Sequence, residues 1–215
     1  MSAAISDDDG TTPATSEFTL SNHTFDALIF DCDGTIADTL PVHFLTFQEA
    51  LGEVGYTLER DWYFARTGLS SDKLFNAYEQ SFGLILDRPA LLARCKLLYQ
   101  NHLDKLREHS FAATIAREQF GHVPMAVASA GMKSAVTSTL QTLDLLELFD
   151  TVVTIEDVKH GKPAPDLYLL AAERLKVAPA RCLVFEDTEE GLEAAHNAGM
   201  RAIDVRPHLI PAVQN

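Results

Sequence analysis

Two carboxylates directly after a short apolar run are the first residues whose types and spacing suggest chemistry. Asp31 and Asp33 flank Cys32, and residues 26–30 (DALIF) precede them. Because they are two residues apart in an extended segment, the two carboxylates point the same way, whereas Cys32 points toward the core. One carboxylate could act as a nucleophile, and the other could protonate a leaving oxygen and then take a proton from water.

Further polar groups follow three later apolar runs. They are Ser129, Lys162 and the neighbouring pair Glu186 and Asp187. The runs that precede them lie at residues 124–128, 151–155 and 181–185. A short apolar run that ends in polar or turn residues is typical of a buried strand. The chain therefore places carboxylates, a hydroxyl and an ammonium at the ends of four predicted strands.

The apolar runs alternate with helical patterns over most of the chain. Strands are predicted at residues 26–30, 124–128, 151–155, 181–185 and 201–205, and helices at residues 133–143, 165–175 and 189–198. This alternation is typical of a doubly wound, Rossmann-like α/β fold, in which helices cover both faces of a parallel sheet. Ligands of such sheets bind outside the carboxyl ends of the strands, so we expect the four polar groups to converge there.

One block of the chain breaks the alternation. Residues 41–111 read as helices only, with helices predicted at residues 42–54, 71–82 and 89–109. We therefore predict a helical cap domain at residues 42–112, inserted into an α/β core domain formed by residues 25–41 and 113–215. Residues 1–24 are rich in small and polar residues and are predicted to form a flexible tail.

The predicted cluster contains the oxygen donors that Mg²⁺ prefers. Asp31, Asp33 and Asp187 could hold the ion while leaving positions for water and a phosphate oxygen. The ion would offset the repulsion between an attacking carboxylate and a phosphate. Ser129 and Lys162 would then bind the phosphoryl oxygens that are not transferred. The sequence thus favours phosphoryl transfer with Mg²⁺ as cofactor.

These segments resemble the haloacid dehalogenase-like (HAD) superfamily of phosphotransferases. The resemblance spans about residues 25–206 and is carried by four motifs in order, namely residues 31–35 (DCDGT), Ser129, residues 161–166 (GKPAPD) and residues 185–188 (FEDT) with Gly191. It implies that Asp31 is the nucleophile and Asp33 the acid/base. It also implies a metal site formed by Asp31, Asp187 and the backbone carbonyl of Asp33, with Glu186 beside it.

Three further residues are expected to contact the substrate. Thr35 belongs to the first motif. His43 lies at the start of the first cap helix, where cap-containing relatives often have a histidine that faces the site. Arg66 lies in the cap segment next to Thr67. The resemblance thus implies a substrate bound between the cap domain and the core domain.

The position of the cap resembles that of the helical-cap subclass, which includes the β-phosphoglucomutases and many sugar-phosphate phosphatases. Residues 124–128, 149–166 and 181–206 look most like the fructose-1-phosphate phosphatase branch. This implies a small sugar phosphate as substrate, similar to fructose 1-phosphate or 6-phosphogluconate. Many relatives have a Pro-Gly pair where the chain returns from the cap, whereas residues 111–115 (FAATI) have neither.

The four motifs alone are compatible with both a phosphatase and a mutase. Mutase members carry a Lys before the Gly-x-Ser of the cap and an Arg after it, where this chain has Thr67 and Ser71. The mutase members also carry a Lys at the position where this chain has Met132. The missing cations favour a phosphatase. Arg66 and Lys133 are each one position away, so a β-phosphoglucomutase-type mutase remains the alternative. The complete motif set argues against a binding protein without activity.

Composition limits the partners and the compartment. There are 17 Lys and Arg residues against 31 Asp and Glu residues, so the formal net charge is −14. Such a charge disfavours binding to nucleic acid and to anionic membranes. Residues 1–21 contain no basic residue and no apolar stretch typical of a signal peptide, and no apolar run is long enough to span a bilayer. We expect a cytoplasmic monomer with reduced cysteines.

Overall fold

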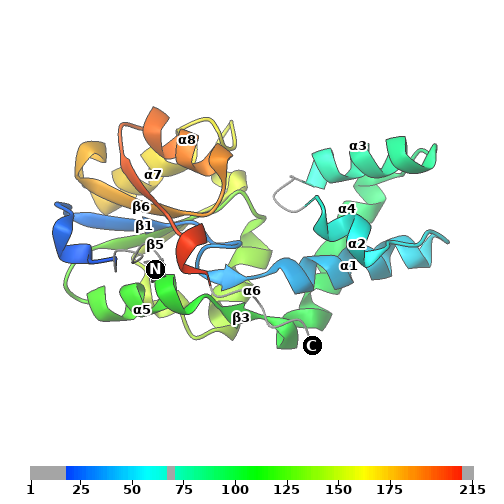
Figure 1. Ribbon diagram of the computed structural model, residues 1–215, viewed down its shortest axis with the longest axis horizontal. Coiled ribbons are helices and arrows are strands. Elements are labelled where there is room, and N and C mark those ends of the chain that lie inside the picture. The colour runs from blue at the N-terminus through cyan, green and yellow to red at the C-terminus, as the bar shows by residue number, and fades with distance from the viewer. Residues whose placement is uncertain (1–17, 67–70, 210–215) are drawn as a thin grey trace, which may run out of the picture.

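A computed structural model describes residues 18–66 and 71–209 (Figure 1). Its centre is a five-stranded sheet with the order β5-β4-β1-β6-β7, in which all neighbouring strands are parallel. The strands are β1 (Ala27–Phe30), β4 (Met125–Ala128), β5 (Thr151–Val153), β6 (Cys182–Glu186) and β7 (Arg201–Asp204). All five coincide with predicted strands within one or two residues, and the doubly wound parallel sheet is confirmed.

Helices cover both faces of this sheet because the strands are apolar on both faces. Leu28 and Phe30 pack on the face covered by α5 (Ser110–Gln119) and α6 (Lys133–Thr142). Ala27 and Ile29 pack on the opposite face, under α7 (Asp166–Leu175) and α8 (Glu189–Asn197). Figure 1 shows α7 and α8 above the sheet and α5 and α6 beneath it.

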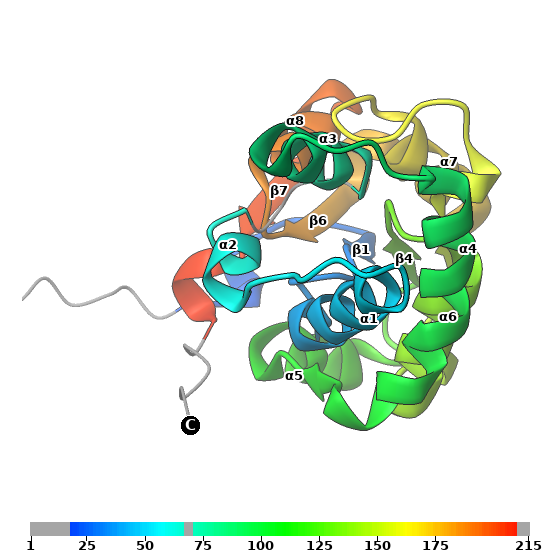
Figure 2. The same cartoon turned by 90° about the vertical axis from the view of Figure 1, so that its right-hand side faces the viewer.

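A separate group of helices lies beyond one end of the sheet in Figure 1 and faces the viewer in Figure 2. It consists of α1 (Leu40–Glu53), α2 (Arg60–Phe64), α3 (Ser71–Phe82), α4 (Arg88–Leu98) and the 3₁₀ helix η2 (Tyr99–Lys105). These helices bury a hydrophobic cluster of their own, which includes Phe44, Phe47, Tyr63, Phe75, Tyr78 and Leu98. We refer to this group as the helical lobe.

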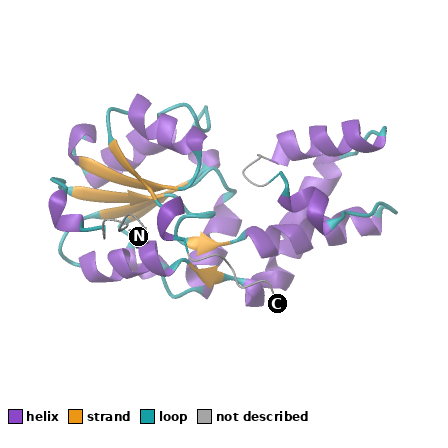
Figure 3. Cartoon of the chain, viewed as in Figure 1, coloured by secondary structure: helices purple, strands orange, loops and turns teal. Residues whose placement is uncertain are grey.

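The prediction that residues 41–111 contain no strand is wrong. Strand β3 (Arg107–Glu108) pairs antiparallel with β2 (Ala37–Asp38), and Figure 3 shows the pair where the chain passes between the sheet and the helical lobe. Two-residue strands are too short to show an alternating pattern in the sequence. The pairing of β2 with β3 holds together the two segments that connect the sheet to the helical lobe.

The long helix predicted at residues 89–109 is also wrong. Helix α4 ends at Leu98, and η2 follows it. Leu91, Cys95 and Leu98 share one buried face, and in an α-helix that face would continue at positions 102 and 105, which are polar. The apolar face of α4 is thus interrupted after Leu98, where η2 begins.

Two predicted boundaries differ from the structure. Helix α5 covers residues 110–119, and Ala112 and Ala113 pack into the core of the sheet, so the expected cap boundary at residue 112 falls inside a core helix. Within the expected tail, Phe18 packs its ring 5.1 Å from that of Phe111, and Leu20–Asn22 form a 3₁₀ turn. Residues 1–17 lie outside the described residues. Among the described helices, none has the length and apolarity needed to cross a bilayer.

Candidate active site

The pairing of the sheet continues past the strand ends and places two site residues. The backbone N–H of Asp31 donates to the carbonyl of Phe185 at 3.0 Å, and that of Ser129 donates to the carbonyl of Val153, also at 3.0 Å. These bonds continue the parallel pairing beyond the strands, so the segments that follow β1 and β4 leave the sheet at the same edge. The expected convergence of polar groups at this edge is therefore built into the backbone.

Lys162 joins two of the predicted motifs. Its Nζ donates to Oδ1 of Asp31 at 2.5 Å and to Oε2 of Glu186 at 2.6 Å. The side chains of Lys162 and Asp31 are 7% and 8% exposed, and that of Glu186 is completely buried. Burial lowers the pKa of Lys162, but the two carboxylates outweigh burial and raise it well above its usual value. Lys162 is therefore a fixed positive charge beside the expected nucleophile.

Glu186 is the most heavily hydrogen-bonded group of the site. Its Oε1 accepts from the backbone N–H groups of Asp187 and Thr188 and from the Thr188 hydroxyl, at 2.8–3.1 Å. Its Oε2 accepts from Lys162 and from the hydroxyl of Tyr168, the latter at 2.5 Å. With five donors around two oxygens, Glu186 has little capacity left for a metal ion.

Two glycines make room for the carboxylates that end β6. A Cβ atom on Gly34 would lie 2.3 Å from Oδ2 of Asp187, and one on Gly191 would lie 2.0 Å from Oε2 of Glu186. Both distances are far below van der Waals contact. The glycines of the first and last motifs therefore give these carboxylates the space that they occupy.

Asp33 faces a different set of partners. The hydroxyl of Ser129 donates to its Oδ2 at 3.1 Å, and Nε2 of His43 lies 3.3 Å from its Oδ1. Removal from water raises the pKa of Asp33, but hydrogen bonds from His43, Thr39 and Ser129 outweigh this and hold the pKa below its usual value. Because His43 belongs to α1, the helical lobe supplies one partner of the expected acid/base.

The remaining carboxylates repel one another. Burial and the neighbouring Glu186 raise the pKa of Asp31 well above its usual value, and the same two causes raise the pKa of Asp187 to about 6. A nucleophilic Asp31 must be ionised, so the site needs positive charge in addition to Lys162. A divalent cation next to these groups would favour their ionised forms.

The donor set fits such a cation. Asp31, Glu186 and Asp187 each offer an oxygen atom, and the three atoms lie within 4.8 Å of one another. Hard oxygen donors of this kind suit Mg²⁺. Since Glu186 is already saturated, Asp31 and Asp187 are the side chains best placed to hold the ion. The Asp33 carboxylate is not part of this cluster.

The three expected substrate contacts lie differently in the structure. The Thr35 hydroxyl donates to Oδ1 of Asp187 at 2.8 Å. His43 contacts Asp33, as described above. The guanidinium of Arg66 stacks 4.1 Å from the ring centre of Trp62 and donates to the Trp62 carbonyl. Contacts of all three residues with substrate stay predictions.

The positions that bear on mutase chemistry are only partly described. Thr67 and the side chain of Ser71 lie outside the described residues. Met132 is 44% exposed at the start of α6, and the backbone N–H of Lys133 donates to Glu156 at 2.7 Å. The described side chains at these positions therefore do not distinguish a phosphatase from a mutase.

Sequence reasoning missed Tyr168, although its hydroxyl contacts Glu186 inside the site. It also missed the partner of Thr35, because Thr35 and Asp187 are 152 residues apart. The one available signal for Tyr168 was an aromatic residue with a polar tip in the first turn of the helix that follows Lys162. That pattern is equally typical of an ordinary core residue.

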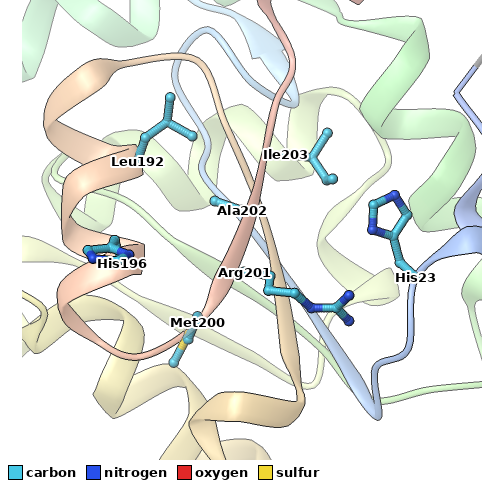
Figure 4. Close-up of a pocket in the computed structure, with 7 residues that line it drawn as sticks. All are labelled: His23, Leu192, His196, Met200, Arg201, Ala202 and Ile203. Carbon is cyan, nitrogen blue, oxygen red and sulfur yellow. The ribbon is translucent and has the colours of Figure 1, made fainter. Parts of the chain in front are cut away.

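A hollow of about 530 Å³ lies elsewhere, beside β7 and α8 (Figure 4). It is lined by His23, Leu192, His196, Met200, Arg201, Ala202 and Ile203. None of the catalytic or metal-binding candidates lines it. The guanidinium of Arg201 donates to the carbonyl of Thr24. The hollow therefore does not belong to the site at the carboxyl ends of the strands.

Comparisons with known proteins agree with this geometry. The family model described as haloacid dehalogenase-like hydrolase matches residues 28–205. The fructose-1-phosphate phosphatase YqaB of Escherichia coli (strain K12) is 37% identical over 179 residues, which are 83% of this chain and 95% of that protein. The β-phosphoglucomutase of Bacillus subtilis (strain 168) is 29% identical over 187 residues, covering 83% and 82%.

A solved structure supports the same assignment. The crystal structure of CbbY from Rhodobacter sphaeroides in complex with phosphate has a TM-score of 0.73 to this chain at 25% identity, and the match covers 83% of this chain and 84% of that one. The family match spans all four motifs and both connections to the helical lobe. The chain therefore belongs to the haloacid dehalogenase-like hydrolases.

Proposed function

We propose that this hydrolase is a Mg²⁺-dependent phosphatase that cleaves a small sugar phosphate through an aspartyl-phosphate intermediate. The observation that carries the proposal is the surroundings of Asp31. Its Oδ1 accepts from Lys162 at 2.5 Å, and one of its oxygens lies within 4.8 Å of carboxylate oxygens of Asp187 and Glu186. A carboxylate between a fixed ammonium and a cation site is suited to attack an anionic phosphoryl group.

In the first step, a carboxylate oxygen of Asp31 attacks phosphorus and the bond from phosphorus to the sugar oxygen breaks. The negative charge of the bound phosphate would raise the pKa of Asp33 against the partners that lower it. The protonated Asp33 gives its proton to the departing oxygen. In the second step, Asp33 takes a proton from a water molecule, and that water attacks the aspartyl-phosphate. Inorganic phosphate leaves, and Asp31 is regenerated as a carboxylate. His43 keeps Asp33 in place through both proton transfers.

Charge stabilisation would be shared between the protein and the ion. Lys162 is held on Asp31, where its ammonium can also meet a phosphoryl oxygen, and Ser129 would bind a second one. Mg²⁺ bound by Asp31 and Asp187 would offset the negative charge that accumulates when the carboxylate approaches the phosphate.

The substrate class is proposed from the relatives and from the position of the helical lobe. The Escherichia coli relative is named for fructose 1-phosphate, and the lobe carries His43 next to Asp33. A substrate between the two lobes would be enclosed on one side by the sheet edge and on the other by α1. Fructose 1-phosphate and 6-phosphogluconate are therefore the first compounds to test.

A mutase is the second candidate because a β-phosphoglucomutase is among the relatives. The two activities differ in product. A phosphatase releases inorganic phosphate, whereas a mutase returns an isomerised sugar phosphate and releases none.

Phosphate release with Mg²⁺, and again with EDTA, tests the proposal. The panel contains fructose 1-phosphate, 6-phosphogluconate, glucose 6-phosphate and β-glucose 1-phosphate. We expect Mg²⁺-dependent release from one or a few compounds. No release from the panel, together with conversion of β-glucose 1-phosphate into glucose 6-phosphate in the presence of a bisphosphate primer, would identify a mutase instead.

A further inference from the structure

Tyr168 lies in the first turn of α7, fully buried beneath the site. Its hydroxyl donates to Oε2 of Glu186 at 2.5 Å, and its ring centre lies 5.1 Å from Nζ of Lys162. Through these contacts Tyr168 touches both members of an ion pair. It does not itself reach Asp31 by any hydrogen bond found in the described residues.

The ion pair around Lys162 is divided between two acceptors. Nζ donates to Asp31 at 2.5 Å and to Oε2 of Glu186 at 2.6 Å. The Glu186 oxygen that accepts from Lys162 is the one that accepts from Tyr168. The Tyr168 hydroxyl therefore supplies part of the hydrogen bonding that this buried carboxylate oxygen requires.

The position of a lysine ammonium between two carboxylates depends on how many other donors each carboxylate has. A lysine side chain has four flexible carbons, so its charge moves readily to the stronger acceptor. If the Tyr168 hydroxyl were absent, Oε2 of Glu186 would keep Lys162 as its single donor. The ammonium would then be drawn toward Glu186 and away from Asp31.

We propose that Tyr168 is a positioning residue for catalysis, whose hydroxyl keeps Glu186 shared so that Lys162 stays on the nucleophile. This inference rests on the proposed function, in which Asp31 attacks and Lys162 binds a phosphoryl oxygen. Displacement of a charged group by about 1 Å from its catalytic position can slow a reaction by up to about a hundredfold. A smaller displacement of Lys162 is expected here.

The test compares Tyr168→Phe with Tyr78→Phe. Tyr78 is 3% exposed in the helical lobe, and its hydroxyl donates to the carbonyl of Thr57 at 2.8 Å. Each substitution removes one hydroxyl and keeps the ring, so each buried tyrosine loses one hydrogen bond. Both variants should lower Tm by a few degrees, whereas only Tyr168→Phe should impair catalysis.

For Tyr168→Phe we expect kcat to fall roughly tenfold, with KM within about threefold of wild type, because the ammonium matters most when charge develops in the transition state. Tyr78→Phe should stay within about twofold in both constants. Equal kcat values for the two variants would overturn the proposal, since Tyr168 would then be an ordinary core residue.

A double-mutant cycle with Glu186→Gln tests the route of the effect. If the hydroxyl acts through the Glu186 carboxylate, Tyr168→Phe should cost less than about twofold in kcat once residue 186 is Gln. An undiminished tenfold loss in that background would contradict the proposal. The cycle separates positioning from a loss of core packing, which does not depend on the charge at residue 186.

Binding of inorganic phosphate, measured by calorimetry in Mg²⁺ buffer, keeps the test separate from the proposed function. Tyr168→Phe should weaken phosphate binding about two- to threefold, and Tyr78→Phe should leave it unchanged. If the wild-type protein hydrolyses none of the panel but this difference persists, the positioning role stands and the proposed activity fails. If wild type is active and the difference is absent from both binding and kcat, the positioning role fails alone.

Discussion

Oδ2 of Asp187 lies against the α-carbon of Gly34, so close that a Cβ atom on Gly34 would be 2.3 Å from it. The two residues belong to the first and last motifs of the site. Gly34 also has a φ of +93°, a conformation that L side chains rarely adopt. The turn after β1 and the carboxylate after β6 are thus fitted to each other.

Gly34→Ala should displace Asp187 and weaken the metal site. We expect the Mg²⁺ concentration for half-maximal activity to rise at least tenfold, since ligand or supporting changes typically cost about 10–100-fold in metal affinity. Gly55→Ala is the matched control, because Gly55 has a φ of +85° and no atom within 4 Å of its would-be Cβ. It should lower Tm by backbone strain and leave the Mg²⁺ requirement unchanged. A similar shift in both variants would show that strain, not collision with Asp187, is responsible.

Asp31→Asn should abolish turnover, because the amide is a poor nucleophile for phosphorus. We expect kcat to fall by about three orders of magnitude or more in the phosphate-release assay. Asp26→Asn is the same substitution at the other end of β1, where the carboxylate forms an exposed pair with Arg181. This control should retain activity within about twofold. Residual activity of Asp31→Asn within tenfold of wild type would rule out the aspartyl-phosphate route.

His43→Ala should slow the reaction through Asp33. The imidazole Nε2 lies 3.3 Å from Oδ1 of Asp33, and its loss removes one of the groups that hold this carboxylate. We expect kcat to fall roughly tenfold, less than the about 10²–10⁴-fold typical of a general acid–base group, because Asp33 itself remains. His102→Ala serves as control, because His102 pairs with Glu49 on the surface of the helical lobe. If both histidine variants lose activity equally, the effect arises from the lobe and not from Asp33.

The strands and the gathering of polar groups at their ends could be predicted because both leave local signals. An apolar run that ends in Asp31 or Ser129 shows where a buried strand stops and where a polar group begins. The roles that the family motifs imply for these groups stay predictions. The described structure brings Asp31, Lys162, Glu186 and Asp187 together as those motifs imply.

The elements that were missed depend on contacts between distant residues. Strands β2 and β3 are defined only by each other, across about 70 residues of helical lobe. The bond from Tyr168 to Glu186 and the stack of Arg66 on Trp62 likewise depend on tertiary packing. Such contacts leave no periodic pattern, because any buried aromatic or exposed cation would look the same in the sequence.

An ion pair joins the helical lobe to α8, which begins two residues after Asp187. Nζ of Lys73 on α3 contacts Oε1 of Glu190 on α8, three residues after Asp187. Both side chains are about half exposed, and exposed pairs contribute about 0–1 kcal/mol. A change of that size in the balance between open and closed lobes corresponds to at most about a fivefold change in kcat/KM.

Reversing the charge of either Lys73 or Glu190 should therefore lower kcat/KM modestly, and reversing both should restore it. We expect Lys73→Glu and Glu190→Lys each to lower kcat/KM about two- to fivefold at low ionic strength, because the opposite charges on α3 and α8 become like charges. The double reversal should restore kcat/KM to within about twofold, and added salt should reduce the loss in the single variants. Arg94→Glu breaks another exposed pair, with Glu53 inside the lobe, and should leave kcat/KM unchanged. If the double reversal is no better than the single variants, contact between Lys73 and Glu190 does not govern closure of the lobe over the site.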